Sequence, residues 1–135
     1  MENTENLNNH VLVIDDDENS TVPLIKKLKD GGLQVSYARD GQEGLDKSLA
    51  EHPDLILLDI TMPVMDGMEM LAKLREDSWG KQAKVIILTN LDFNIKASES
   101  FNLGVYEYLV KTNWNLGDIV GKVKEKLGEF GKSHI

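Results

Sequence analysis

Residues 55–59 read Leu-Ile-Leu-Leu-Asp, which is a run of four aliphatic side chains followed directly by a carboxylate. Short runs rich in Val, Ile and Leu are typical of strands that are buried on both faces, as in parallel sheets. Three similar runs, and a weaker one at 33–38 with partial alternation, complete a set of five. A polar residue closes each of the three: residues 11–14 are followed by Asp15, 85–88 by Thr89, and 105–110 by Lys111.

The stretches between these runs have helical spacing. In the first, Val22, Ile25 and Leu28 lie three apart, Pro23 lies near the first turn, and Gly31 follows the end. The apolar positions of the others are Leu45 and Leu49, then Met68, Leu71 and Leu74, then Ile95, Ala97 and Phe101, and finally Leu116, Ile119, Val120, Val123 and Leu127, with Asn113 or Asn115 as cap. Strand and helix therefore alternate five times, which predicts an α/β fold: a parallel five-stranded sheet with helices on both faces and right-handed crossovers.

Composition restricts the classes of function. The chain has 135 residues, enough for one domain, and contains no cysteine, which excludes disulfides and thiolate chemistry. A formal net charge of −8 disfavours a nucleic-acid-binding surface, and we interpret the lysines at 26, 27 and 29 and at 122, 124 and 126 as solvated helix faces. The apolar runs are too short to cross a membrane, and the polar first nine residues do not resemble a signal peptide. We therefore expect a cytoplasmic protein that binds neither nucleic acid nor membrane.

The polar residues that close the strands predict a site. Ligands of open parallel sheets bind outside the carboxyl ends of the strands, where Asp15, Asp16 and Asp59 would meet. Carboxylates packed together repel one another, and a hard divalent cation such as Mg²⁺ removes that conflict. A carboxylate beside such an ion can accept a phosphoryl group, and the lysine and threonine that close the last two strands could bind its oxygens.

Four segments carry a resemblance to a known family. They are 11–16 (VLVIDD), 57–67 (LLDITMPVMDG), 87–89 (ILT) and 108–111 (YLVK), with matching spacing from residue 10 to about 128. Together they resemble the receiver domain of two-component response regulators. The resemblance implies a flavodoxin-like, doubly wound (βα)5 fold with strand order 2-1-3-4-5.

The resemblance also implies a role for each matching residue. Asp59 corresponds to the phosphoacceptor, which is also a metal ligand. Asp16 corresponds to a direct Mg²⁺ ligand, Asp15 to a partner acting through water, and the main-chain carbonyl of Thr61 to a further ligand; Mn²⁺ is the expected substitute ion. Lys111 corresponds to the lysine that pairs with the acceptor and then with the phosphoryl group. Thr89 corresponds to the switch hydroxyl and Tyr108 to the aromatic switch residue behind it.

Several residues have simpler interpretations or depart from the family pattern. Asp17 is expected to cap the first helix, and the turn from Met62 to Gly67 to shape the loop beside the acceptor. Thr112 stands where the family usually has proline, which favours a trans bond after Lys111. Asn90 stands where a small residue is common, and we expect it to modulate the rates of phosphoryl transfer and hydrolysis.

We therefore expect a stand-alone receiver domain at 10–130, with a flexible segment at 1–9 and a tail at 131–135. The resemblance implies a phosphoacceptor rather than an enzyme, loaded by a histidine kinase or a histidine phosphotransfer protein. Output would go through a downstream protein that binds the face from Phe93 to Phe130. Two alternatives stay open: a phosphatase of the haloacid-dehalogenase type with Asp15 as nucleophile, and a docking module that works without phosphorylation.

Overall fold

The computed structural model describes residues 9–62, 64–90 and 102–128. Five parallel strands form one sheet in the order β2-β1-β3-β4-β5. Their bounds are His10–Ile14 for β1, Gln34–Ala38 for β2, Leu55–Leu58 for β3, Val85–Thr89 for β4 and Glu107–Val110 for β5. The predicted flavodoxin-like fold and its strand order are confirmed.

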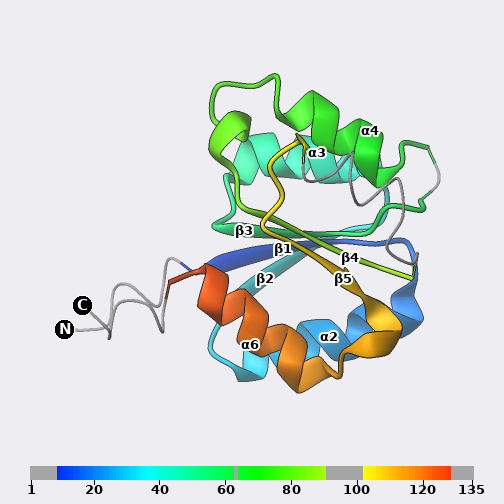
Figure 1. Cartoon of the computed structure of the whole chain (residues 1–135), viewed down its shortest axis with the longest axis vertical. Coiled ribbons are helices and arrows are strands. Elements are labelled where there is room, and N and C mark those ends of the chain that lie inside the picture. Colours follow the sequence, from blue (N-terminus) through cyan, green and yellow to red (C-terminus); the bar gives the residue numbers. More distant parts are fainter. Residues whose placement is uncertain (1–8, 63, 91–101, 129–135) are drawn as a thin grey trace.

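The helices lie in two layers on either side of the sheet. Figure 1 shows α3 (Gly41–Glu51) and α4 (Gly67–Leu74) on one face, and α2 (Glu18–Asp30) and α6 (Leu116–Lys126) on the other. Two short 3₁₀ helices, η1 (Gly80–Gln82) and η2 (Lys111–Asn113), precede β4 and follow β5. The fourth helix predicted from Ile95, Ala97 and Phe101 lies outside the described residues, as do residues 1–8 and 131–135 of the predicted end segments.

Alternate residues of each central strand enter opposite halves of the core. In β1, Leu12 and Ile14 belong to the cluster on the α3 and α4 side, whereas Val11 and Val13 belong to the cluster on the α2 and α6 side. These four side chains are at most 2% exposed. Burial on both faces explains why the strand sequences are continuously apolar instead of alternating.

The first helix differs from its sequence-based prediction. Its buried positions are Thr21, Leu24 and Leu28, whereas Val22 is 64% exposed. The helix begins at Glu18, so Pro23 is its sixth residue and lies beyond the first turn, where its missing N–H removes one intrahelical hydrogen bond. The spacing of three between apolar residues identified a helix correctly, and Leu28 and Ile25 do pack against the core, but Val22 does not.

Two predicted caps are confirmed. The side chain of Asp17 accepts a hydrogen bond from the Asn19 amide at the start of α2, and that of Asn115 accepts one from the Asp118 amide at the start of α6. The carboxylate and the amide each satisfy a backbone donor that a helix end leaves unpaired. Both helices therefore begin at fixed positions close to the carboxyl edge of the sheet.

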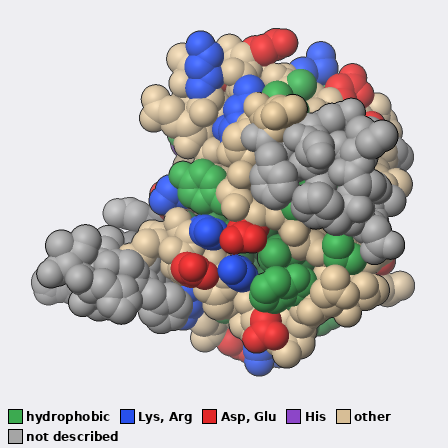
Figure 2. Space-filling view, viewed as in Figure 1, with side chains coloured by type: hydrophobic (Ala, Val, Ile, Leu, Met, Phe, Trp, Pro, Cys, Tyr) green, Lys and Arg blue, Asp and Glu red, His purple; other side chains and the backbone are tan. Residues whose placement is uncertain are grey.

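The lysines of α6 are interleaved with acidic side chains. Figure 2 shows the two charge types side by side on the face that carries β5 and α6. Glu107 of β5 lies 3.5 Å from Lys122 and 3.2 Å from Lys126. The side chains of Lys122 and Lys126 are 26% and 24% exposed, so this helix face is less solvated than we predicted, because both lysines pair with Glu107. Among the described helices, none is both long and apolar enough to cross a membrane.

Candidate functional site at the carboxyl edge of the sheet

Asp15 and Asp59 follow the two neighbouring strands at which the strand order reverses. Strand β1 pairs with β3 in parallel, with Ile14 opposite Leu58. The amide of Asp59 donates to the Ile14 carbonyl at 2.9 Å, so the hydrogen bonding between β1 and β3 continues one residue beyond the end of β3. The Asp15 residue is 4% exposed and Asp59 is 8% exposed. The strand order thus brings the two buried carboxylates together at the expected position.

Asp16 completes an acidic cluster. Its carboxylate and those of Asp15 and Asp59 each offer an oxygen, and these three oxygens lie within 4.8 Å of one another. Asp16 is exposed, whereas the other two are buried. Oxygen ligands of this charge fit a hard divalent cation such as Mg²⁺, which typically uses one or two carboxylates and keeps several waters. The predicted acidic site is therefore present and is compatible with magnesium binding.

The electrostatic surroundings of Asp59 oppose its ionisation. Burial raises the pKa of its carboxyl to about 6, and the nearby negative charge of Asp15 acts in the same direction. A hydrogen bond from Thr89, the positive charge of Lys111 and the Ile60 amide lower this pKa in part. The Ile60 amide donates to Asp59 Oδ1 at 2.8 Å. A divalent cation would relieve the remaining charge conflict, which is the second reason why the cluster fits a metal ion.

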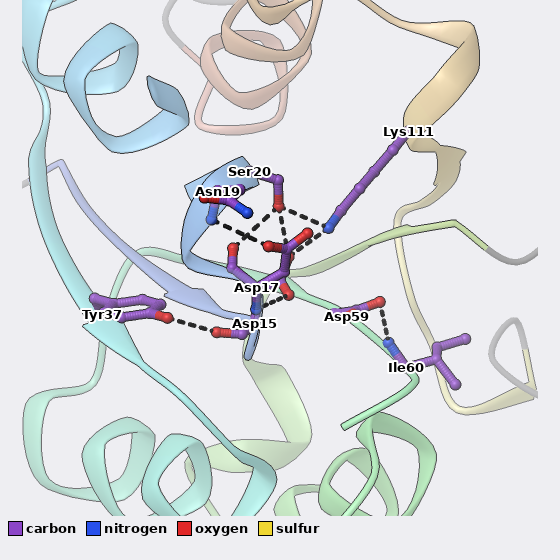
Figure 3. A network of polar contacts seen from close by, with 8 residues as sticks. All are labelled: Asp15, Asp17, Asn19, Ser20, Tyr37, Asp59, Ile60 and Lys111. Atoms are coloured by element: carbon purple, nitrogen blue, oxygen red, sulfur yellow. Dashed lines mark hydrogen bonds and ion pairs between the residues drawn. The ribbon is translucent and has the colours of Figure 1, made fainter. Parts of the chain in front are cut away.

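Lys111 lies at the same edge but pairs with a different carboxylate from the one expected. Its Nζ atom lies 2.5 Å from Asp15 Oδ2 and 3.1 Å from Ser20 Oγ (Figure 3). It interacts with Asp59 as a neighbouring charge. The physical reason is the path of the side chain: the lysine lines a cavity between α2 and α6, and Asp15 lies three residues before the start of α2. No peptide bond is cis in the described residues, which include the Lys111–Thr112 bond.

The two predicted switch residues occupy adjacent strands. Thr89 ends β4, is 1% exposed and forms a side-chain hydrogen bond with Asp59. Tyr108 of β5 is 9% exposed, lies opposite Ile87 and belongs to the core cluster on the α3 and α4 side. The threonine hydroxyl is thus already at the site, while the tyrosine belongs to the core. Asn90 follows Thr89 and is exposed.

The loop after β3 is shaped as predicted for a structural turn. Gly67 opens α4 and donates its amide to the Ile60 carbonyl at 2.7 Å. A Cβ atom on this glycine would lie 2.2 Å from the Asp59 carbonyl oxygen, so only glycine fits here. Asp66 caps α4 by accepting a hydrogen bond from the Glu69 amide at 2.9 Å. Thr61 is exposed in this loop, and its carbonyl remains a predicted ligand.

Two contributors to the site were not predicted from the sequence. Ser20 contacts Lys111, and its hydroxyl also lies 3.4 Å from Asp15 Oδ2. Tyr37 of β2 donates its hydroxyl to the main-chain carbonyl of Asp15 at 2.8 Å (Figure 3). The position of Tyr37 in the strand next to β1 was the available signal, since a side chain at that register can reach the first residue after β1. For Ser20, the available signal was its position about one helical turn after the acidic residues 15–17.

Comparisons with known proteins identify the family. Residues 11–124 match the family described as "Response regulator receiver domain". The transcriptional regulatory protein PrrA of Mycobacterium leprae is 36% identical over 124 residues, which cover 90% of this chain and 51% of that protein. The alkaline phosphatase synthesis transcriptional regulatory protein PhoP of Bacillus subtilis is 34% identical, over 78% of this chain and 43% of its own length. The chain thus spans about half the length of these curated relatives.

Solved structures agree with this result. The response regulator receiver domain protein (CheY-like) from Methanospirillum hungatei has a TM-score of 0.82 and 32% identity, over 92% of this chain and 97% of that one. The CheX-CheY-BeF3-Mg complex from Borrelia burgdorferi has a TM-score of 0.78 and 27% identity, over 86% and 87%. With the fold, the acidic cluster and these likenesses in agreement, the chain belongs to the receiver domains of response regulators, the phosphorelay signalling family.

Proposed function

We propose that Asp59 is the phosphoacceptor of this chain and that phosphorylation of its carboxylate switches a protein–protein interaction. One observation carries the proposal: three carboxylates, a lysine and a threonine from four strand ends converge where the strand order reverses. Within this cluster Asp59 accepts a hydrogen bond from Thr89, which is one of the two groups expected to bind a phosphoryl oxygen. Family membership supports the same assignment.

The chemistry is a phosphoryl transfer. An oxygen of ionised Asp59 attacks the phosphorus of a phosphohistidine on a histidine kinase or phosphotransfer protein. The P–N bond breaks, its electron pair returns to the imidazole, and an acyl phosphate forms on Asp59. Lys111 then leaves Asp15 and pairs with the transferred group, while the Thr89 hydroxyl donates to one of its oxygens. Asn90, exposed beside Thr89, lies where it can affect the access of water and hence the rate of hydrolysis.

The metal ligands would be the carboxylates of Asp15, Asp16 and Asp59 and the main-chain carbonyl of Thr61. Mg²⁺ bound there supplies positive charge next to the phosphoryl oxygens. Mn²⁺ accepts the same oxygen ligands and would substitute for it. The role of Asp15 is to orient bound water, and that of Asp16 is direct ligation, which its exposure permits.

The output would follow from a shift in population between two states. In the phosphorylated state the Thr89 hydroxyl stays on the phosphoryl group and Tyr108 packs closer behind it. The surface that responds is the predicted face from Phe93 to Phe130, of which residues 102–128 are described. Tyr106, which directly precedes β5, is 45% exposed and offers an apolar contact for a downstream protein.

The test is labelling with a small acyl phosphate in the presence of Mg²⁺, followed by intact mass. We expect one phosphoryl group on the wild-type protein, none on Asp59→Asn, and slower but measurable labelling of Asp15→Asn. Glu76→Gln, which changes an exposed carboxylate in the turn after α4, is the matched control and should label like the wild type.

The same experiment separates the alternatives. Labelling that is lost in Asp15→Asn but kept in Asp59→Asn, together with turnover of added phosphoesters, would instead support the phosphatase. No label from any acyl phosphate or histidine kinase would support a docking module that works without phosphorylation.

A further inference from the structure

Ser20 occupies a position between the two charges of the site. It lies in the first turn of α2 and is partly exposed. Its Oγ atom accepts a hydrogen bond from Lys111 Nζ at 3.1 Å. As a donor, Ser20 Oγ has two alternative acceptors, Asp15 Oδ2 at 3.4 Å and the Asp17 carbonyl oxygen at 3.3 Å, and both distances are long for an O–H donor. The shortest hydrogen bond of the Ser20 side chain is therefore the one that it accepts from the ammonium of Lys111.

The resting position of Lys111 competes with a metal ion. The ammonium lies 2.5 Å from Asp15 Oδ2, and Asp15 is one of the three residues whose oxygens could hold a divalent cation. Two cations close to one carboxylate repel each other strongly in a partly buried site. Binding of a divalent cation therefore favours departure of Lys111, and every contact that Lys111 loses on leaving weakens the apparent affinity for the metal.

We propose that Ser20 is a positioning residue that holds Lys111 on Asp15 in the resting site and thereby weakens divalent-cation binding. The inference rests on the proposed function, because it assumes that Asp15, Asp16 and Asp59 bind Mg²⁺. Ser20 acts through Lys111: its hydroxyl adds a second anchor to the ammonium and is released when the lysine moves toward Asp59. The serine thus sets how readily the site passes from its resting to its metal-loaded arrangement.

Tryptophan fluorescence gives a direct readout of metal binding. The chain has two tryptophans, and Trp114 lines the cavity of about 190 Å³ that Lys111 and Ser20 also line. Trp79 stacks on His52 with ring centroids 4.2 Å apart. The change Trp79→Phe therefore leaves Trp114 as the only reporter, and titration with Mg²⁺ alone measures affinity without any phosphoryl transfer.

In this background, Ser20→Ala should bind Mg²⁺ about threefold to tenfold more tightly, the range expected for loss of one ordinary hydrogen bond at a partly exposed site. Ser20→Thr keeps the hydroxyl and should restore the lower affinity. Asn19→Ala changes an exposed neighbour in the same helical turn and should bind like the parent. Thermal unfolding of each variant checks that α2 is intact.

A double-mutant cycle tests whether Ser20 acts through Lys111. In a Lys111→Met background, Ser20→Ala should leave the Mg²⁺ affinity unchanged, because no ammonium remains to be held. The proposal is overturned if Ser20→Ala leaves the Mg²⁺ affinity unchanged, or lowers it, in the protein that keeps Lys111. It is also overturned if Ser20→Ala still raises the Mg²⁺ affinity in the Lys111→Met background. Absence of Mg²⁺ binding to the parent, or binding that Asp59→Asn and Asp16→Asn leave intact, would instead overturn the metal site itself.

Discussion

The Nζ atom of Lys111 lies 2.5 Å from Oδ2 of Asp15, although 96 positions separate the two residues in the sequence. The pair joins the ends of β5 and β1, which have two strands between them in the sheet. The side chains are 14% and 6% exposed, so both charges are largely removed from water. Removing one partner of such a pair leaves the other charge buried and uncompensated.

Lys111→Met should therefore lower the free energy of unfolding by about 2 kcal/mol when no divalent cation is present, because the three carboxylates lose their nearest positive charge. Urea denaturation at neutral pH with a chelator measures this loss, and added Mg²⁺ should recover part of it. Lys26→Met is the matched control, since Lys26 and its partner Asp30 are 76% and 60% exposed. That change should cost less than about 0.5 kcal/mol. Equal losses in the two variants would contradict the argument.

Asp16→Asn separates metal binding from stability. The carboxylate of Asp16 is exposed, and in the absence of metal its negative charge is destabilised by repulsion from Asp15 and Asp59. We expect the variant to be at least as stable as the wild type in a chelator, but to gain much less stability from Mg²⁺ because a direct ligand is missing. Thermal unfolding over a series of Mg²⁺ concentrations measures both quantities. A full Mg²⁺ response in the variant would show that Asp16 is not a ligand.

Most of the fold could be predicted because buried parallel strands leave a direct trace in the sequence. The runs at 11–14, 55–58 and 85–88 are apolar without alternation. Each of them, like the less uniform run at 105–110, is followed by a polar residue that the sheet then brings to one edge. Asp59 was identified by this logic together with the family resemblance. The caps at Asp17 and Asn115 were predictable for a similar reason, since capping depends on local chemistry.

What escaped prediction depends on contacts between elements. Val22 fits the helical spacing, yet it is Thr21, Leu24 and Leu28 that face the sheet, because the orientation of α2 is set by packing. The contacts of Lys111 with Asp15 and Ser20 depend on the direction from which the lysine crosses the sheet edge. Spacing along the chain carries no information about such a direction.

The raised pKa of Asp59 predicts how stability depends on pH in the absence of metal. Between the ordinary value of 3.8 and about 6, the folded state keeps a proton that the unfolded state has lost. The free energy of unfolding contributed by this group therefore falls as pH rises through that window and is constant above it. After allowance for solvent at the open sheet edge, the loss should be about 1–2 kcal/mol.

Asp59→Asn should remove this decrease, so that the variant gains stability over the wild type between pH 4 and pH 7. Urea denaturation across that range with a chelator present measures the difference, and Glu76→Gln, at an exposed carboxylate, should run parallel to the wild type. A constant difference between Asp59→Asn and the wild type would show that Asp59 ionises as readily in the fold as in the unfolded chain.

Gly67→Ala tests whether the turn after β3 holds the backbone of the acceptor in place. The added methyl group would lie 2.2 Å from the Asp59 carbonyl oxygen and 2.8 Å from the Ile60 Cα atom, both backbone atoms that cannot rotate away. We expect a loss of about 2–3 kcal/mol in the free energy of unfolding, as for overpacking of a close contact, together with weaker Mg²⁺ binding because Asp59 must shift.

Gly121→Ala is the matched control, since nothing lies within 4 Å of its added Cβ in α6. That change should stabilise the protein by about 0.5–1 kcal/mol, because alanine loses less backbone entropy in a helix. Urea denaturation and Mg²⁺ titration of both variants decide the matter: a Gly67→Ala protein that keeps wild-type stability and affinity would show that the loop tolerates a side chain there, and that Asp59 is positioned by β3 alone.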